Sequence, residues 1–415
     1  MSSLHIALFN RAFYPEISAT GQLLTELAQG LVRDHRCRVT VVAGMPQAPF
    51  QESWIQSPGW WLIHSEEWNG ITIWRARGTA WDKGRFWRRL TNYLTYFGSA
   101  CLAAFKLDRP DVIIALTDPP IIGLAGLLAS RRFRCPLVIS YRDLFPEVAH
   151  LLEKPPGKFV EWVLNAVNRF LNKEADRLIA LGEAMRDRLI QKKKANPEKI
   201  IIIPDWADIC AIRPEPKRNS FSQTHGLAER FVVMHSGNIG TSQNLDVLID
   251  AADALRPFQD ILFVLVGDGV RKSSLQEYAN LLGLTNVLFL PYQPKEMLSA
   301  IFASADCFYV SLKPGLAGYI TPSKLYGILA AGRPYIAAVE ESCEVFRITR
   351  KYNCGLLAQP GNSSDITEKI RKFYDDPELV RELGANARKG SEEFDRAKGV
   401  SAYFRLCREL TSAGT

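Results

Sequence analysis

The chain has 415 residues, of which 47% are hydrophobic and 23% are charged, the composition of an ordinary globular protein with two or three domains. Its eight cysteines are scattered without a Cys-x-x-Cys pair, which favours reduced thiols and argues against a disulfide framework. The net charge of +7 belongs to the first half, because residues 1–200 carry 27 Lys and Arg against 19 Asp and Glu, so nucleic acid and an anionic membrane are possible partners.

Short apolar runs rich in β-branched residues alternate with amphipathic runs along the first half of the chain. The first of them, residues 3–10, reads as a buried strand, because it is too short for the core of a signal peptide and has no cleavage site. The alternation predicts a parallel sheet with crossover helices, such as the amphipathic run at residues 23–34. The expected strands of this half are residues 5–10, 38–44, 112–117, 137–143 and 177–183.

The segment at residues 110–130 comes closest to a membrane span, but Asp118, Pro119 and Pro120 interrupt it. No apolar run reaches the length of about 18 residues that a spanning helix needs. We therefore interpret this segment as a strand, a turn and a helix.

A second series of strands follows a polar linker at residues 213–226, so the domain boundary is placed between Trp206 and Gly226. Two doubly wound domains in series would leave a cleft between them, with ligands beyond the carboxyl ends of the strands. A final helix is expected at residues 394–410. The expected strands of the second series are residues 230–238, 261–269, 286–291, 306–312 and 334–339.

Three turns of the second half are candidates for a ligand site. The glycines of Ser236–Gly240 and Gly267–Gly269 allow a close approach of the main chain to a ligand. Pro322 is expected in the first turn of a short helix, where Ser323 and Lys324 would add a hydroxyl and an ammonium to a helix end that attracts anions. Plain strand–helix turns and a solvated loop remain alternatives.

The first half offers two polar groups after expected strands. Residues 18–21 form a Ser/Thr/Gly loop ahead of an amphipathic helix. Arg142 and Asp143 end a strand and Glu147 follows closely, an arrangement that suits acid–base chemistry or the binding of hydroxyl groups. An Asp helix cap and a surface ion pair are the alternatives for these carboxylates.

Aromatic and basic residues are mixed before the apolar run at residues 94–105, a pattern typical of a membrane interface. An ordinary core helix with a charged face is the alternative, and a groove for single-stranded nucleic acid is a weaker one. The residues concerned are Trp81, Lys83, Arg85, Phe86, Trp87, Arg88 and Arg89.

No metal site is expected, because none of the six histidines pairs with another at ligand spacing and there is no Asp-x-Asp pair. A Walker A loop and a Gly-x-Ser-x-Gly elbow are also missing from the sequence.

Several motifs, in their order and spacing, resemble family 4 retaining glycosyltransferases of the GT-B fold. They are SGNIGTSQNLDVLIDAA, VLVGDG, NVLFLPYQP, PSKLYGILAAGRP and NCGLL, with RDLFPE, EADRLIALGEAMRDRL and IIIPDWAD in the first half. The resemblance covers nearly the whole chain and is strongest to the branch of colanic-acid-type and O-antigen N-acetylfucosamine transferases.

The chain departs from the family pattern at four positions. Two glutamates that usually frame the motif before the short helix correspond to Tyr319 and Gly327, and the usual Arg and Lys of the first turn correspond to Asn238 and Gln243. Two acids and two cations are thus missing together. We expect Lys324 to take over the diphosphate of a nucleotide sugar, and the resemblance suggests Glu344 for the ribose.

The resemblance implies two Rossmann-like α/β domains, an acceptor-binding domain at 1–207 and a nucleotide-sugar-binding domain at 208–392, with a helix at 393–415 crossing back to the first. It implies metal-independent, retaining transfer of a sugar from a nucleotide diphosphate sugar, with UDP favoured, to a polyprenyl-linked or other saccharide acceptor of cell-surface polysaccharide synthesis. A nucleotide-sugar epimerase and a non-catalytic nucleotide-sugar-binding protein are the alternatives.

The protein is expected in the cytoplasm, peripherally attached to the anionic inner face of the plasma membrane. No cofactor and no nucleic-acid partner are expected. The expected catalytic residues are Asp143, Glu147 and Lys324. The expected donor-binding residues are Gly237, Asn238, Gly240, Gln243, Gly267, Tyr292, Pro322, Ser323, Lys324 and Glu344. The expected acceptor-binding residues are Ser18, Thr20, Gly21 and Arg142.

Overall fold

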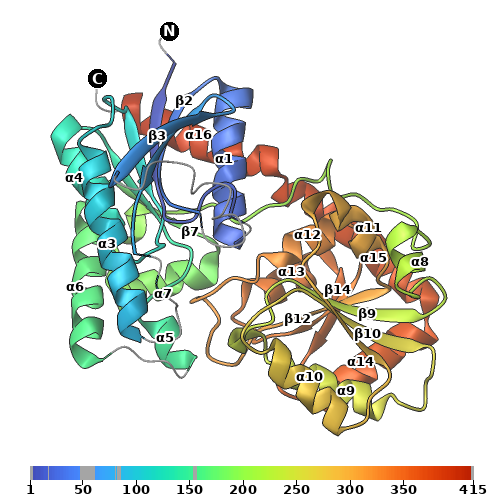
Figure 1. Ribbon diagram of the computed structural model, residues 1–415. Coiled ribbons are helices and arrows are strands. Elements are labelled where there is room, and N and C mark those ends of the chain that lie inside the picture. Colours follow the sequence, from blue (N-terminus) through green and yellow to red (C-terminus); the bar gives the residue numbers. More distant parts are fainter. Residues whose placement is uncertain are drawn as a thin grey trace. The chain divides into compact units, whose positions relative to one another are not determined.

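The computed structural model describes residues 3–16, 18–46, 61–79, 81, 86–152 and 157–412. Contacts within the chain define two compact units (Figure 1). The first consists of Met1–Pro204 and Ala397–Thr415, and the second of Asp205–Arg396. Each unit contains one sheet covered by helices, which is the α/β class expected from the alternating pattern.

The first unit is built on an eight-stranded sheet with the order β3-β4-β2-β1-β5-β6-β7-β8. The strands pair in parallel except β3, which runs antiparallel to β4 at the edge. The central strand β1 is buried along its whole length, as an apolar strand covered on both faces should be. The strands are β1 (His5–Phe9), β2 (Arg38–Gly44), β3 (Ile63–Trp68), β4 (Ile71–Ala76), β5 (Val112–Ala115), β6 (Leu137–Ser140), β7 (Arg177–Ala180) and β8 (Ile200–Ile202).

Helices cover both faces of this sheet. Figure 1 shows α3, α4 and α6 together on one side of it and α1 and α16 on the other. The segment 110–130 folds as β5, a turn and α4, as the sequence predicts. The helices are α1 (Ala19–His35), α3 (Phe86–Ala104), α4 (Gly123–Phe133), α5 (Glu147–Leu151), α6 (Lys158–Glu174), α7 (Glu183–Lys193) and α16 (Arg396–Ser412).

The antiparallel hairpin β3–β4 was not predicted from the sequence. Its turn is Asn69-Gly70, and both residues have positive φ, 49° and 77°. That conformation suits a two-residue hairpin and is the reason why Asn-Gly is a strong hairpin signal. The sheet of the first unit is therefore mixed, with one antiparallel strand at its edge.

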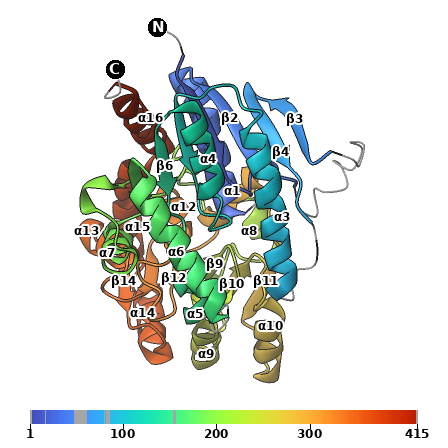
Figure 2. The same cartoon turned by 90° about the vertical axis from the view of Figure 1, so that its left-hand side faces the viewer.

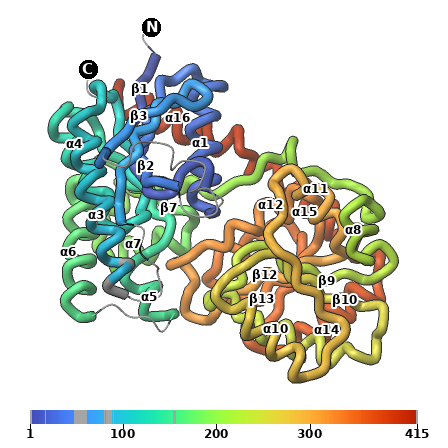
Figure 3. Tube along the Cα trace, viewed as in Figure 1, coloured from blue at the N-terminus to red at the C-terminus, as the bar shows by residue number. Residues whose placement is uncertain are grey.

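The C-terminal helix α16 belongs to the first unit, where it packs on α1 (Figure 3). Val400 lies so close to Gly30 that a Cβ on the glycine would come within 2.8 Å of its methyl group. The ring of Phe404 stacks on His35, with centroids 4.2 Å apart. The hydroxyl groups of Tyr403 and Ser140, at the end of β6, lie 2.9 Å apart, so α16 also reaches the sheet.

The second unit has a six-stranded sheet with the order β11-β10-β9-β12-β13-β14, and its described strand pairs are all parallel. This is a doubly wound order, in which the connections change direction between β9 and β12. Ligands in such sheets bind beyond the carboxyl ends of the strands at that point. The strands are β9 (Phe231–Ser236), β10 (Ile261–Val266), β11 (Val287–Leu290), β12 (Cys307–Ser311), β13 (Tyr335–Ala338) and β14 (Gly355–Ala358).

The core of the second unit lies between these strands and helices such as α9 and α14, where Phe263, Leu248 and Ile370 are fully buried. The strand β14 was not among the predicted strands. The helices are α8 (Ser220–Thr224), α9 (Asp246–Ala254), α10 (Lys272–Leu281), α11 (Leu298–Ala303), α12 (Lys324–Ala330), α13 (Glu344–Tyr352), α14 (Ser363–Asp375) and α15 (Pro377–Ser391).

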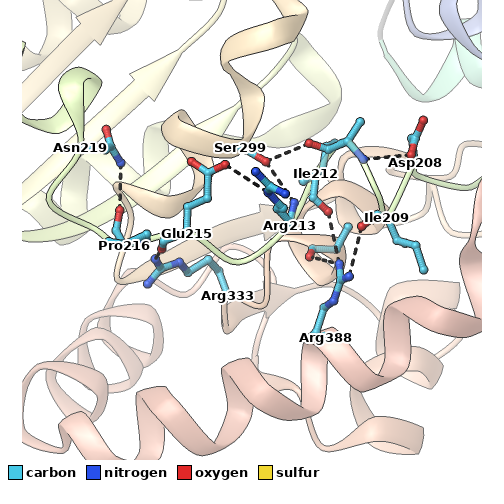
Figure 4. A network of polar contacts seen from close by, with 12 residues as sticks. Asp208, Ile209, Ile212, Arg213, Glu215, Pro216, Asn219, Ser299, Arg333 and Arg388 are labelled. Carbon is cyan, nitrogen blue, oxygen red and sulfur yellow. Dashed lines mark hydrogen bonds and ion pairs between the residues drawn. The ribbon is translucent and has the colours of Figure 1, made fainter.

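The residues just before the polar linker are held to the rest of the second unit by hydrogen bonds to their main chain (Figure 4). The guanidinium of Arg388, on α15, donates to the carbonyl oxygens of Ile212 and Ile209, at 3.2 and 3.1 Å. It also donates to the carbonyl of Ala330, the last residue of α12, at 2.7 Å. Arg388 thus joins the segment just before the linker to the carboxyl end of the helix that begins with Lys324.

Candidate functional site

The two glycine turns of the second unit interlock through their main chains. Gly237 follows β9 and donates its N–H to the carbonyl of Val266, the last residue of β10, at 2.9 Å. A Cβ on Gly267 would lie 1.9 Å from the carbonyl oxygen of Gly237, and one on Gly269 would lie 2.3 Å from that of Ile239. Both glycines also have positive φ. These contacts explain the glycines without reference to a ligand, and they fix the shape of the turns.

Lys324 joins this arrangement from the other side of the point where the strand order reverses. Its Nζ lies 3.0 Å from Nε2 of His235, the second-last residue of β9, and 3.7 Å from the position that a Cβ on Gly237 would take. The ammonium therefore lies against the first glycine turn, beyond the carboxyl ends of β9 and β12. The sequence assigned both Lys324 and this turn to donor binding, but it did not single out His235.

The short helix begins later in the chain than expected. Ser323 is the N-cap of α12, whose first residue is Lys324, and Pro322 lies before the cap. The prediction that Pro322 lies in the first turn of this helix is therefore wrong. Its carbonyl instead accepts the N–H of Leu325 at 3.3 Å.

Burial lowers the pKa of Lys324 to about 7, because an ammonium loses solvation inside the protein. Burial also lowers the pKa of His235 well below its usual value, and the neighbouring Lys324 charge lowers it further. The imidazole is therefore neutral at physiological pH. An anionic ligand beside Lys324 would raise the pKa of this lysine and so favour its charged form.

Asn238 and Gln243 stand where the family usually has cations, and both are neutral amides. The Oε1 of Gln243 accepts the N–H of Gly240 at 3.0 Å. A Cβ on Gly240 would come within 2.6 Å of Nδ2 of Asn238, so the three residues form one tight turn. Gln243 thus shapes the turn, while the exposed side chain of Asn238 is open to solvent.

The two positions that usually carry glutamate are closed by packing. A Cβ on Gly327 would lie 2.8 Å from the ring of Phe302, which is buried. Tyr319 has only 7% of its surface exposed. Phe302 occupies the space beside the helix, which explains on steric grounds why position 327 has no glutamate.

The remaining donor-side candidates lie on other loops and helices of the second unit. The hydroxyl of Tyr292 lies 3.5 Å from the carbonyl oxygen of Asp268, in the second glycine turn, and about half of its side chain is exposed. Glu344 is the first residue of α13 and is partly buried. Tyr292 is thus placed beside the interlocked turns.

In the first unit, residues 18–21 are not a loop, since α1 begins at Ala19. Ser18 is the N-cap, and its Oγ accepts the N–H of Gly21 at 3.3 Å. Thr20 and Gly21 lie in the first turn of the helix. The Ser/Thr/Gly pattern is here a helix start, in which the serine satisfies a free N–H group.

Arg142 and Asp143 follow β6, and the N–H of Arg142 donates to Oγ1 of Thr117, which follows β5, at 3.0 Å. Glu147 begins α5, and its carboxylate forms an ion pair with Lys193 at 2.7 Å. Only 1% of the Lys193 side chain is exposed. The ion pair that the sequence left open for Glu147 is present, but with a buried partner.

A second charged group lies just after the carboxyl ends of strands β1 and β5 in the first unit, and it was not predicted from the sequence. Arg11 follows β1 and forms ion pairs with Asp118, after β5, at 3.1 Å and with Glu16 at 3.3 Å. Burial works against the charge of Arg11, but the two carboxylates outweigh it and raise its pKa. The order of this sheet reverses between β1 and β5. The positions of Arg11 and Asp118 just after these two strands were the sequence signal that could have identified this group.

Much of the basic–aromatic cluster lies outside the described residues. These are Lys83 and Arg85, together with the side chains of Phe86, Trp87 and Arg89. Trp81 has 55% of its surface exposed, and Arg88 is also exposed. In the described part of the chain, no helix is long and apolar enough to cross a membrane.

The helices α3, α4 and α6, which Figure 2 turns toward the viewer, and the residue after α3 carry exposed large apolar residues. Phe159 and Trp162 on α6 are 75% and 67% exposed. Arginines of α4 lie over two further rings, Arg131 over Phe170 and Arg132 over Phe105. These exposed apolar residues, called here the aromatic face, are Leu94, Leu102, Phe105, Leu128, Phe159, Trp162 and Phe170.

Two doubly wound units in one chain define the GT-B architecture of glycosyltransferases. The chain belongs to the glycosyl transferases of group 1, whose family profile matches residues 217–390. A second profile, that of the glycosyl transferase 4-like domain, matches residues 19–206.

Among curated relatives, WcaI of Escherichia coli (strain K12), to which a glycosyl transfer role in colanic acid biosynthesis is provisionally assigned, is 26% identical over 382 residues. That match covers 89% of this chain and 92% of WcaI. Two solved structures share the fold. HepE of Anabaena, in complex with UDP, has a TM-score of 0.74 and 19% identity and covers 98% of this chain and 100% of its own. WaaG, a glycosyltransferase involved in lipopolysaccharide biosynthesis, has a TM-score of 0.72 and 15% identity and covers 97% and 99%.

Proposed function

We propose that this glycosyltransferase moves a sugar from a UDP-sugar to a lipid-linked saccharide during the synthesis of a cell-surface polysaccharide, with retention at the anomeric carbon. The observation that carries the proposal is the position of Lys324, whose ammonium lies against the Gly237 turn where the strand order reverses. A buried cation beside a main-chain turn suits a diphosphate, which needs positive charge and N–H donors.

The choice of donor and acceptor is supported by similarity. HepE, which shares the fold, was solved in complex with UDP. WcaI and WaaG are associated with colanic acid and with lipopolysaccharide. Retention is the outcome expected of the retaining family that the motifs resemble.

Lys324 is proposed to stabilise the departing diphosphate electrostatically, a role that can contribute about 3 kcal/mol for one well-placed donor. On this proposal the reaction requires no metal ion. The donor-side partners proposed around Lys324 are Gly237, Asn238, Gly240, Gln243, Gly267, Tyr292, Pro322, Ser323 and Glu344.

The first unit is proposed to bind the acceptor, through Arg142 and Asp143 after β6 and the start of α1 at Ser18, Thr20 and Gly21. Glu147 is retained as a candidate here only through its effect on this group, because its carboxylate is engaged by Lys193. A lipid-linked acceptor stays in the bilayer, so we propose that the first unit attaches to an anionic membrane through the aromatic face and the basic residues near Trp81.

The direct test is incubation of the protein with labelled UDP-sugars and a membrane extract. Label in the lipid fraction that depends on Lys324 supports the proposal. An isomerised nucleotide sugar would identify an epimerase, and binding of UDP without any turnover would identify a nucleotide-sugar-binding protein. Activity that is lost in EDTA and restored by magnesium or manganese would overturn the metal-independent mechanism.

A further inference from the structure

His235 is a buried polar residue in the interior of the donor site. Its side chain has no exposed surface. Its Nε2 lies 3.0 Å from Nζ of Lys324 and 3.3 Å from the carbonyl oxygen of Asn238. Its Nδ1 faces the main chain of Tyr309 without a well-formed hydrogen bond. Burying an imidazole in this way costs stability unless its nitrogens are hydrogen-bonded.

The two contacts of Nε2 require opposite protonation states. A charged ammonium has only donors, so Lys324 can donate to Nε2 only when that nitrogen carries a lone pair and the ring proton is on Nδ1. A hydrogen bond from Nε2 to the carbonyl of Asn238 requires the proton on Nε2, and then Lys324 must be a neutral amine. The pair can therefore exist in two arrangements that differ by one proton.

We propose that His235 is a positioning residue that holds the Lys324 ammonium at the Gly237 turn, and that the pair takes up one proton when a diphosphate binds. The proposal rests on the proposed function, since the diphosphate is that of the nucleotide-sugar donor. In the ligand-free protein the pair alternates between its two arrangements. The negative charge of the ligand selects the arrangement in which the ammonium is present.

The surroundings of the pair leave this proton uncompensated. Burial is the cause that lowers the pKa of Lys324 to about 7. Among the described residues, Lys324 is the charged group that affects His235, which lies between the main chains of Asn238 and Tyr309. The charged residues of the adjoining turn are engaged elsewhere or exposed, since Lys272 donates to the carbonyl of Gly267 at 3.0 Å and Asp268 faces solvent. A bound diphosphate would thus be the anionic partner that Lys324 lacks.

The first experiment needs no ligand. Nitrogen-15 NMR of the histidine rings, with the His235 signal assigned from its loss in His235→Gln, reports which ring nitrogen carries the proton. We expect the Nδ1–H form at about pH 6 and a change toward the Nε2–H form as the pH rises past about 7, where Lys324 loses its proton. In Lys324→Met the change should disappear. A charged ring at neutral pH, or the same pH dependence in Lys324→Met, would overturn the pairing.

The second experiment measures the proton directly. Calorimetric titration with UDP-glucose, whose diphosphate does not titrate near neutral pH, is carried out in two buffers with different ionisation enthalpies. We expect an uptake of about half a proton at pH 7 and about nine tenths at pH 8. Tight binding without proton uptake at pH 8 would overturn the proposal.

Variants at position 235 separate positioning from general stability. His235→Gln keeps an acceptor for Lys324 and should bind UDP-glucose within about threefold of the wild type, whereas His235→Leu should bind at least about tenfold more weakly. His225→Gln, at the end of α8 in the same unit, is the matched control and should behave as the wild type. Equal binding by the Leu and Gln variants would show that His235 does not position Lys324.

The two proposals can fail separately. If no UDP compound binds the wild-type protein, the donor proposal fails and the proton uptake fails with it, but the NMR result still decides whether His235 and Lys324 share a proton. If UDP-glucose binds and the uptake is zero, the donor proposal stands and the proton-coupled pair does not. If His235→Leu does not fold, the Gln variant and the NMR titration still give a result.

Discussion

The carboxylate of Glu147 lies 2.7 Å from the ammonium of Lys193, whose side chain is almost completely buried. The same ammonium donates to the carbonyl of Phe145 at 2.8 Å and to Oδ1 of Asn165 at 2.9 Å. Burial lowers the pKa of Lys193, and the carboxylate of Glu147 offsets only part of that shift. Glu147 therefore keeps a buried charge neutralised just after the strand that presents Arg142 and Asp143.

This difference predicts separate effects for two neighbouring carboxylates. Glu147→Gln should lower the free energy of unfolding by about 1–3 kcal/mol, because Lys193 loses its charged partner but keeps two neutral acceptors. Asp143→Asn should leave stability unchanged and lower sugar transfer by about a hundredfold, the loss of one acid–base group. Urea unfolding and a transfer assay measure the two quantities.

The control for Glu147 is Glu183→Gln, which removes an exposed ion pair with Arg186 and should change stability by less than about 0.5 kcal/mol. UDP affinity should be unchanged in Asp143→Asn if this residue acts on the acceptor. A loss of donor affinity equal to the loss of transfer would place Asp143 on the donor side instead.

Replacing Lys324 should stabilise the ligand-free protein and abolish its activity. Lys324→Met fills similar space without a charge, and we expect a gain of about 1–2 kcal/mol in unfolding free energy near neutral pH. The pKa of Lys324 in the folded state is about 7, below the ordinary lysine value of 10.5 that applies to the unfolded chain. Below pH 7 both states carry the proton and the folded state bears the whole cost of burying it.

Between pH 7 and 10.5 the unfolded state binds more protons, so the stability of the wild type rises with pH and the advantage of Lys324→Met shrinks. Urea unfolding at several pH values measures this trend. Affinity for UDP-glucose should fall above pH 7, by up to about tenfold per unit. An unchanged UDP affinity in Lys324→Met would remove Lys324 from the phosphate site.

The aromatic face should bind anionic vesicles. Each Lys or Arg near an anionic leaflet contributes about 1 kcal/mol, and the contribution weakens as salt screens the surface. We expect the protein to sediment with anionic vesicles, to be released by high salt, and to bind neutral vesicles weakly. Changing both Phe159 and Trp162 to Ser should reduce binding to anionic vesicles by at least about tenfold.

The matched control is Leu281→Ser, because Leu281 is 83% exposed and belongs to the second unit rather than to the aromatic face. UDP binding should survive in both variants. A parallel change of Lys83, Arg85, Arg88 and Arg89 to Ser tests the cluster identified from the sequence. Equal binding to neutral and anionic vesicles would contradict a charge-assisted attachment, and no binding to either would leave both surfaces without a role at a membrane.

Gly327 should be intolerant of a side chain because of Phe302. Alanine normally favours a helix over glycine by about 1 kcal/mol, but its Cβ here would meet the Phe302 ring. We expect Gly327→Ala to destabilise the protein by about 1–2 kcal/mol, as overpacking does. Combining it with Phe302→Leu should recover part of that loss. If Gly327→Ala alone is stabilising, the Phe302 ring can move aside and the steric explanation for the missing glutamate is wrong.

Sequence patterns were sufficient for the parts of the fold that depend on local order. The alternation of apolar runs and helices predicted the central strands of both sheets, and the motifs that contain Lys324 and the Gly237 turn assigned both to donor binding. The hairpin β3–β4 could have been predicted from Asn69-Gly70, whose preference for positive φ is local.

Other features depend on contacts between distant residues and leave little trace in the sequence. His235 and Lys324 are separated by 89 positions, and nothing local distinguishes a histidine that faces a lysine from one in an ordinary core. The same holds for Lys193 and Glu147. The stripe of α6 that carries Phe159 and Trp162 reads as a buried helix face, because the pattern of an exposed aromatic stripe and that of a core stripe are identical.

The interlocked turns also limit how this protein can change its preference for a donor. Because the main chain of the first turn fills the space where Gly267 and Gly269 would carry side chains, neither turn can gain or lose a residue without displacing its neighbour. Changes in loop length are a usual source of new specificity on a shared scaffold, but these two turns do not tolerate them. A laboratory library aimed at a new nucleotide sugar would do better to vary the exposed side chains beside them, Asn238 and Tyr292, and to leave the glycines alone.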